Sequence, residues 1–211
     1  ELRSTLSKLR LNGLTIGEDN RNRYMLSPFR SKTGRNQPSN TRAIFGPSTW
    51  MRSFIKPEQG MAIAYIDWCQ QEFGIAAVLS EDSAMLESYQ SGDPYLAFAI
   101  QSGTLPANAT KATHPAERER FKACILGVQY GMGPHSLAVQ IGQSVDHAKL
   151  LLELHRRTYR TFWKWSDAVQ EHYALGGKLT TVFGWELQPI VEYNPRSVRN
   201  YLMQANGAEM L

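Results

Sequence analysis

Apolar side chains recur at intervals of three and four residues along most of the second half of the chain, which is the spacing of amphipathic helices. The pattern predicts helices over residues 70–80, 83–89, 94–101, 115–129, 146–159 and 162–175, another carrying Leu137 and Ile141, and a last one still running at Leu211. Asp93 before Pro94, Ser144, and Asn194 before Pro195 are suitable helix caps. A short amphipathic helix is also predicted over residues 1–12.

Segments with the character of strands are fewer and shorter. The apolar run Met61–Asp67 predicts a buried strand with Asp67 at its carboxyl end. Residues 178–183 and 185–191 predict a small hairpin around Gly184. Residues 13–50 are rich in Gly, Asn, Ser, Pro and Arg, and predict mostly loop with short strand pieces. The expected class is therefore α+β, rich in helix, with a small antiparallel sheet.

Composition adds a preference for anionic partners without requiring one. Of the 211 residues, 42% are hydrophobic and 20% charged, and the formal net charge is +4, which describes an ordinary globular protein with a slight basic excess. Basic residues gather in one segment that holds few acids, a pattern typical of contact with a phosphate backbone. They are Arg21, Arg23, Arg30, Lys32, Arg35, Arg42 and Arg52.

Cysteine usage and hydropathy indicate a cytoplasmic protein with no membrane association. Cys69 and Cys124 lack metal-ligand spacing and lie in apolar contexts, so both are expected to be reduced core thiols. No apolar run reaches the length of a membrane span, and the first ten residues lack the apolar centre of a signal peptide.

The stretch from Arg118 to Gly131 carries the strongest candidate for chemistry. Arg118, Lys122, Leu126 and Tyr130 follow at steps of four and form a stripe about 18 Å long on a helix. Two cations at one end and an aromatic ring at the other are groups that could hold a triphosphate and stack on its base. The alternative is a solvated basic face with a core tyrosine. Gly131 is expected to end the helix and to let another backbone approach closely.

Four motifs in order resemble DNA polymerase family A, the DNA polymerase I group, over roughly residues 29–211. The pattern R-x3-K-x7-Y-G of the stripe resembles that family's fingers helix. Asp67-Trp68-Cys69-Gln70-Gln71-Glu72 resembles its D-Y-S-Q-x-E palm motif, and the segment 196–204 resembles its R-x3-N-x3-Q helix. The residues 33–35 match the T-G-R that precedes the palm motif.

The resemblance implies metal-dependent nucleotidyl transfer. Asp67 would bind both of two Mg2+ ions, and the backbone carbonyl of Trp68 would supply a further ligand. Lys122 would join Asp67 as a catalytic residue. Without the resemblance, a helix cap is the favoured role for Asp67. A metal-dependent nuclease using Asp67 and Glu72 is a rival.

The resemblance also implies a nucleotide site. Arg118 and Lys122 would grip the β- and γ-phosphates, and Gln70 would line the pocket. Glu72 would be the steric gate against ribonucleotides, although a first-turn acid also complements the helix dipole. Tyr130 would stack near the templating base. Two positions of this nucleotide site depart from the family pattern, which places their contacts in question: Tyr95, where His is common, and Leu126, where Phe or Tyr is usual.

Contacts with primer–template DNA are implied at Arg35, Arg196, Asn200 and Gln204. Minor-groove acceptors are similar for all base pairs, so donors placed there test pair geometry without reading sequence. The alternative for Asn200 and Gln204 is a polar helix face.

The expected organisation is a single catalytic-domain segment of the right-hand polymerase fold. Residues 1–80 would form part of a palm with a basic arm, 81–192 the fingers, and 193–211 the start of a helix returning to the palm. The expected function is template-directed addition of dNMP to a primer 3′-OH, with dNTPs and primer–template DNA as partners, in a divergent branch that is phage-encoded or nucleoid-associated. The family's second metal-binding Asp follows a His, and no His here precedes an Asp. Two alternatives follow. This segment would have weak activity, or it would be a non-catalytic nucleic-acid-binding module.

Overall fold

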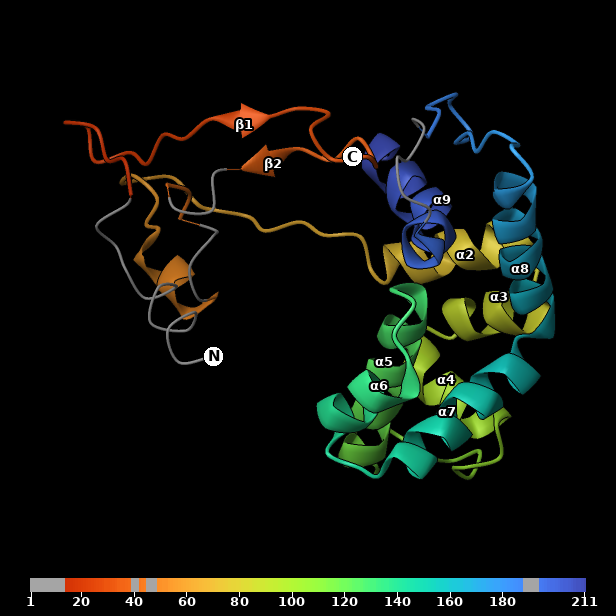
Figure 1. Ribbon diagram of the computed structural model, residues 1–211. Helices are drawn as coiled ribbons and strands as arrows, with labels where there is room; N and C mark the ends of the chain where they lie inside the picture. The colour runs from red at the N-terminus through yellow and green to blue at the C-terminus, as the bar shows by residue number, and fades with distance from the viewer. Residues whose placement is uncertain (1–13, 39–41, 45–48, 188–193) are drawn as a thin grey trace. The chain divides into compact units, whose positions relative to one another are not determined.

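The computed structural model describes residues 14–38, 42–44, 49–187 and 194–211, and the chain forms two compact units, Glu1–Trp68 and Cys69–Leu211 (Figure 1). The predicted helix over residues 1–12 lies outside the described residues. The predicted division into palm and fingers segments remains a prediction.

The first unit is mostly turns and irregular chain. β1 (Leu26–Ser27) pairs antiparallel with β2 (Gln37–Pro38), with Leu26 opposite Pro38. A 3-10 helix, η1 (Thr49–Phe54), follows. These short elements confirm the prediction of loop with strand pieces.

The segment Met61–Asp67 corrects one prediction, because it is neither a strand nor buried. Ile63 is 56% exposed and Ile66 91% exposed. A strand is completed by hydrogen bonds to a neighbour, and none of the described residues pairs with this segment. An apolar run therefore gave the wrong element here. Cys69, which follows it, is exposed as well and is not a core thiol.

The second unit is helical, which confirms the helix-rich α+β class. Its described residues form eight α-helices: α2 (Gln71–Ser80), α3 (Ser83–Gln90), α4 (Pro94–Gln101), α5 (Pro115–Gln129), α6 (Pro134–Ile141), α7 (Val145–Thr158), α8 (Arg160–Ala174) and α9 (Pro195–Glu209). α9 ends at Glu209 and does not continue to Leu211 as predicted. None of the described helices has the length and apolar character to cross a bilayer.

The predicted caps begin the helices that they were expected to begin. The Asp93 carboxylate accepts from Leu96 N at 3.2 Å at the start of α4. Ser144 and Asn194 accept from backbone N–H groups in the first turns of α7 and α9. Local hydrogen-bond chemistry therefore sets these boundaries.

Aromatic contacts, most of them edge-to-face, form the main core between α2, α4, α5, α7 and α8. Phe98 lies at the centre, with ring centroids 4.9 Å from Phe121, 5.2 Å from His155 and 5.4 Å from Tyr159. Cys124 is fully buried in the same core, and its burial raises the pKa of the thiol to about 12, so it stays protonated.

A second, smaller cluster packs α9 against the segment after α8. Leu179, Leu187, Val198, Tyr201 and Ala205 are its buried members. The predicted hairpin is reduced to one antiparallel bridge between Thr180 and Glu186, with a turn through Gly184 at φ 97°. The end of its second predicted strand, residues 188–191, lies outside the described residues.

One buried carboxylate joins the start of α3 to the start of α8. Asp82 is 3% exposed and caps α3 by accepting from Met85 N at 3.0 Å. Its other oxygen accepts from Thr161 N and Phe162 N, both at 3.0 Å, in the first turn of α8. Asp82 therefore caps two helices that start about eighty residues apart.

Candidate functional site

α5 presents the predicted stripe on its accessible side. Phe121, Cys124, Ile125 and Val128 face the core and are at most 3% exposed. Arg118, Lys122 and Leu126 are partly buried, and Tyr130 at the end of the helix is 46% exposed. The tyrosine is therefore not a core residue, and the four side chains lie where a ligand can reach them.

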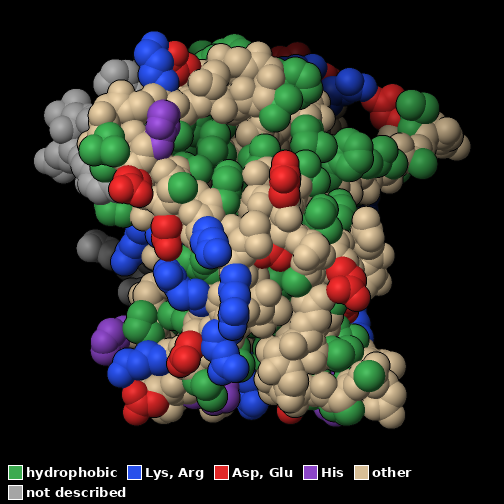
Figure 2. Space-filling model, turned by 90° about the vertical axis from the view of Figure 1, so that its right-hand side faces the viewer, with side chains coloured by type: hydrophobic (Ala, Val, Ile, Leu, Met, Phe, Trp, Pro, Cys, Tyr) green, Lys and Arg blue, Asp and Glu red, His purple; other side chains and the backbone are tan. Residues whose placement is uncertain are grey.

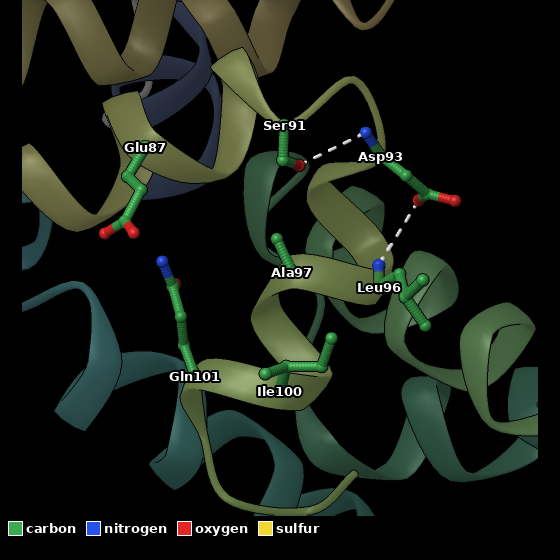
Figure 3. A pocket seen from close by; sticks show the side chains of 7 residues that line it. All are labelled: Glu87, Ser91, Asp93, Leu96, Ala97, Ile100 and Gln101. Atoms are coloured by element: carbon green, nitrogen blue, oxygen red, sulfur yellow. Dashed lines mark hydrogen bonds between the residues drawn. The ribbon is translucent and has the colours of Figure 1, made fainter. Parts of the chain in front are cut away.

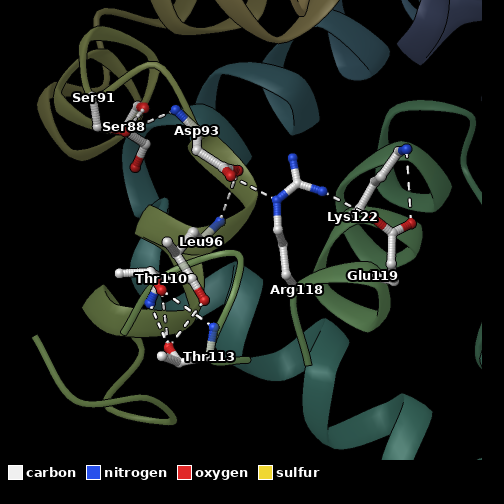
Figure 4. A network of polar contacts seen from close by, with 9 residues as sticks. All are labelled: Ser88, Ser91, Asp93, Leu96, Thr110, Thr113, Arg118, Glu119 and Lys122. Atoms are coloured by element: carbon white, nitrogen blue, oxygen red, sulfur yellow. Dashed lines mark hydrogen bonds and ion pairs between the residues drawn. The ribbon is translucent and has the colours of Figure 1, made fainter. Parts of the chain in front are cut away.

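Arg118 is held between two carboxylates (Figure 4), and its guanidinium lies beside a tyrosine ring. Its Nε donates to Asp93 Oδ2 at 2.6 Å, and its Nη1 donates to Glu119 Oε1 at 2.9 Å. The Arg118 side chain is only 11% exposed, and its Cζ lies 5.3 Å from the Tyr95 ring centroid. The guanidinium is thus fixed in place before any ligand arrives.

Lys122 stands one turn further along the same face. Its Nζ lies 3.7 Å from Glu119 Oε2 and 6.0 Å from the Tyr95 ring centroid. Tyr95 is 8% exposed, and burial raises the pKa of its phenol, so the ring beside both cations stays neutral. At the position where a His is common in the family, this chain therefore has an aromatic contact for two cations.

Asp93 also borders a shallow pocket of about 260 Å³ between α3 and α4 (Figure 3). The pocket is lined by Glu87, Ser91, Asp93, Leu96, Ala97, Ile100 and Gln101. One carboxylate oxygen caps α4, and the other faces Arg118. Asp93 therefore couples the start of α4 to the cation on α5, a role that the sequence pattern, which identified it as a cap, did not indicate.

Gly131 brings the start of α9 against the end of α5. Its φ of 64° ends α5 as predicted. A Cβ at this position would lie 2.9 Å from Arg196 Cγ and 3.4 Å from Arg196 Cα, so only glycine permits the approach. Arg196 therefore lies beside Gly131, next to Tyr130. The predicted nucleotide stripe and the predicted DNA-contact helix meet at this point.

Arg196, Asn200 and Gln204 follow at four-residue steps along one side of α9, with Arg196 exposed and the other two half-buried. Asn200 Oδ1 is buried without a hydrogen-bond partner in the described chain. Gln129, just before Tyr130, is 4% exposed, and its Nε2 likewise lacks a partner there. Nothing in the spacing of the sequence distinguished Gln129 from the apolar residues around it.

Two further predicted residues, Gln70 and Glu72, lie at the start of α2. Gln70 precedes α2 in the left-handed conformation at φ 44°, which is uncommon for a residue other than Gly, Asn or Asp. Glu72 is half-buried in the first turn, and Gln71 Nε2 donates to Gly207 O of α9 at 3.1 Å. α2 and α9 thus pack together within the helical unit.

Asp67, Trp68 and Arg35 belong to the first unit. Asp67 and Trp68 are exposed. No group of three or more His, Cys, Asp or Glu side chains is placed to hold a metal ion in the part of the chain that the structure describes. A carboxylate and a backbone carbonyl are nevertheless the hard oxygen donors that Mg2+ prefers, so the chemistry of the pair fits that ion.

The sequence pattern of DNA polymerase family A matches residues 37–209, which include all the motifs of the second unit. The chain belongs to DNA polymerase family A. The match covers the α5 stripe, the start of α2 and the whole polar side of α9. It confirms the resemblance inferred from the four motifs.

Relatives with curated descriptions include phage and bacterial polymerases of this family. The chain is 25% identical over 199 residues to a DNA polymerase of Mycobacterium phage L5, covering 93% of this chain and 31% of that protein. It is 27% identical over 150 residues to the thermostable DNA polymerase I of Thermus aquaticus, covering 70% of this chain and 18% of the relative. The chain therefore spans about a third or less of these family A relatives.

A solved structure shares the fold. The POL domain of Pol1 from M. smegmatis, in complex with DNA primer–template and dNTP, superposes with a TM-score of 0.80 at 22% sequence identity. The match covers 99% of this chain and 40% of that one. The helix-rich arrangement is thus that of a polymerase domain.

Proposed function

We propose that the protein is a DNA-directed DNA polymerase that adds deoxynucleotides to a primer 3′ end, and that this chain supplies its triphosphate grip and part of its primer–template contact. The observation that carries the proposal is the accessible side of α5. There a fixed arginine and a lysine stand at one end and an exposed tyrosine at the other, beside the first residue of the polar side of α9.

Arg118 and Lys122 would bind the β- and γ-phosphates. Two carboxylates already accept from Nε and from Nη1 of Arg118, so the two N–H groups of Nη2 and the second N–H of Nη1 are the donors left for phosphate oxygens. Because the guanidinium is held before binding, little side-chain entropy is lost when the phosphate arrives. Positioning and charge neutralisation are the main contributions to phosphoryl transfer, so these cations would act on rate and affinity together.

Asp67 and the Trp68 carbonyl would hold the divalent ion, Mg2+ in this proposal. When bound, the ion supplies neutralisation of the charge that develops at phosphorus. Tyr130 would lie under the templating position, with Arg196, Asn200 and Gln204 contacting the minor groove near the primer end, and Arg35 the backbone. Gln70 and Glu72 would border the sugar, and Leu126 would provide its apolar contact.

Primer extension by the natural polymerase that contains this chain tests the proposal. Asp67→Ala is expected to abolish dNMP addition, whereas Asp146→Ala, which removes an exposed carboxylate that pairs with Lys149, is expected to leave it unchanged. Normal extension by the Asp67 variant would contradict the proposal.

A non-catalytic nucleic-acid-binding module is the second candidate, favoured by the basic residues of the first unit and the polar side of α9, neither of which needs a metal ion. Such a module would bind primer–template DNA without a requirement for Mg2+ and would show no Mg2+-dependent affinity for dNTPs.

A further inference from the structure

The turn between α7 and α8 carries four cations within nine residues. Arg156 and Arg157 stand in the last turn of α7, and Arg160 and Lys164 stand in the first two turns of α8. All four residues are exposed. We refer to Arg156, Arg157, Arg160 and Lys164 as the basic corner. Figure 2 looks onto the side of the molecule that carries α8 in Figure 1 and shows Lys and Arg side chains gathered on that face.

Only one cation of the basic corner has a clear structural role. The Arg156 Cζ lies 4.2 Å from the Trp163 ring centroid, and Arg199 of α9 lies 5.0 Å from the same ring centroid. Asp167 pairs with both arginines, at 3.4 Å and 2.8 Å. This arrangement packs α7, α8 and α9 together, and both oxygens of the Asp167 carboxylate take part in it.

The other three cations contribute less to the fold than Arg156 does. Within the described part of the chain, no carboxylate forms an ion pair with Arg157, Arg160 or Lys164. Arg160 and Lys164 are four residues apart on one helix face, where like charges destabilise a helix by roughly 0.2–0.5 kcal/mol. Arg157 complements the dipole at the end of α7, but Arg160 and Lys164 stand near the positive end of α8. Their clustering therefore needs another explanation.

The backbone of the corner is also anchored to the core. Tyr159 alone separates the two helices, is fully buried, and shares a hydrogen bond of 3.0 Å with Ser88 Oγ. The first N–H groups of α8 are already bound by Asp82 from the core side. An anion at the corner would thus be held by the exposed side chains, which the fold presents at fixed spacing, and not by the helix N-terminus itself.

We propose that the basic corner is a second nucleic-acid contact, which binds the phosphodiester backbone through Arg157, Arg160 and Lys164, separate from the α5 stripe and the polar side of α9. Exposed cations without carboxylate partners release counterions when they bind phosphates, which gives affinity without sequence preference. The inference rests on the proposed function in one respect only: a nucleic acid is the polyanion that this protein meets.

The test compares two triple variants of the chain that lose the same charge. Arg157→Gln/Arg160→Gln/Lys164→Gln removes the proposed contacts. Lys111→Gln/Lys149→Gln/Lys178→Gln removes three exposed cations elsewhere. Fluorescence anisotropy measures binding of oligo(dT), and of a duplex of equal length, at several salt concentrations. All the substituted residues are exposed, so thermal unfolding should change little in either variant.

The corner variant is expected to reduce the slope of log K against log salt by about 2 for oligo(dT), at about 0.7 per lost phosphate contact. Its affinity at low salt is expected to fall about tenfold, while the control variant keeps the wild-type slope. Comparing oligo(dT) with the duplex shows whether the basic corner prefers single-stranded or double-stranded nucleic acid.

Three results would overturn the inference: equal losses in the two variants, no binding of either nucleic acid by the wild-type chain, or polyglutamate binding with the same dependence on the corner. Affinity for dNTPs separates this inference from the proposed function. If the corner variant keeps the wild-type salt slope and still binds dNTPs with Mg2+, only the nucleic-acid contact at the basic corner is refuted, and the proposed function is not.

Discussion

Replacing Asp82 should destabilise the helical unit more than the loss of any single-helix cap. Its two carboxylate oxygens receive three backbone N–H groups, each at 3.0 Å, from α3 and α8. Loss of a cap costs about 0.5–2 kcal/mol per helix, and Asp82 serves two helices from a buried position. Asp82→Ala should therefore lower the free energy of unfolding by about 3 kcal/mol.

Two comparison variants make the reasoning quantitative. Ser144→Ala removes a cap from α7 alone, where a single N–H group at 3.2 Å is lost, and should cost about 1 kcal/mol. Asp82→Asn keeps one acceptor oxygen but turns an amide N–H toward the other helix. Its cost in free energy of unfolding should therefore lie between those of Asp82→Ala and Ser144→Ala. Urea unfolding followed by circular dichroism measures all three, with the m-value expected to stay constant. A cost for Asp82→Ala no larger than that for Ser144→Ala would refute the double cap.

Three further predictions follow from single positions. His155 is 1% exposed, and burial lowers its pKa from 6.5 to about 3. Below pH 6.5 the unfolded chain therefore takes up a proton that the folded chain does not. The free energy of unfolding, measured by denaturation curves, should fall by about 2 kcal/mol between pH 7 and pH 5, and by less in His155→Gln. Gly131→Ala should cost about 1–2 kcal/mol in thermal unfolding because of its positive φ and the contact with Arg196. Gly133→Ala, with open space around it, should cost less, because it loses only the preference for Gly over Ala at the N-cap of α6. Asp93→Ser keeps a cap acceptor for α4 but removes the partner of Arg118 Nε, so the affinity for dNTPs should fall several-fold in a titration. The control Glu87→Gln, on the other side of the same pocket, should leave that affinity unchanged.

Local chemistry made most of the helices predictable. Asp93, Ser144 and Asn194 cap their helices through side-chain hydrogen bonds to residues two or three positions away. Such short-range contacts can be inferred from the local sequence alone. The α5 stripe was predictable for the same reason, because a four-residue repeat fixes one helix face.

Contacts between distant residues were not predictable. Arg118 meets Asp93 across 25 positions, and Asp82 meets Phe162 across 80, so neither partnership leaves a local pattern. Met61–Asp67 failed for a related reason: an apolar run specifies a strand only when a neighbouring strand completes its hydrogen bonds. The buried amide of Gln129 also gave no signal, since it stands at a core position of an otherwise regular helix.

The central claim is that Arg118 and Lys122 hold the triphosphate of an incoming nucleotide. The most direct measurement is Mg2+-dependent binding of a fluorescent dNTP to Arg118→Ala and Lys122→Ala, with Lys149→Ala as a control for the loss of one exposed cation. Each site variant is expected to bind at least about tenfold more weakly while remaining folded by circular dichroism, and the control should bind as the wild type does. Unchanged affinity in folded Arg118 and Lys122 variants would contradict the account.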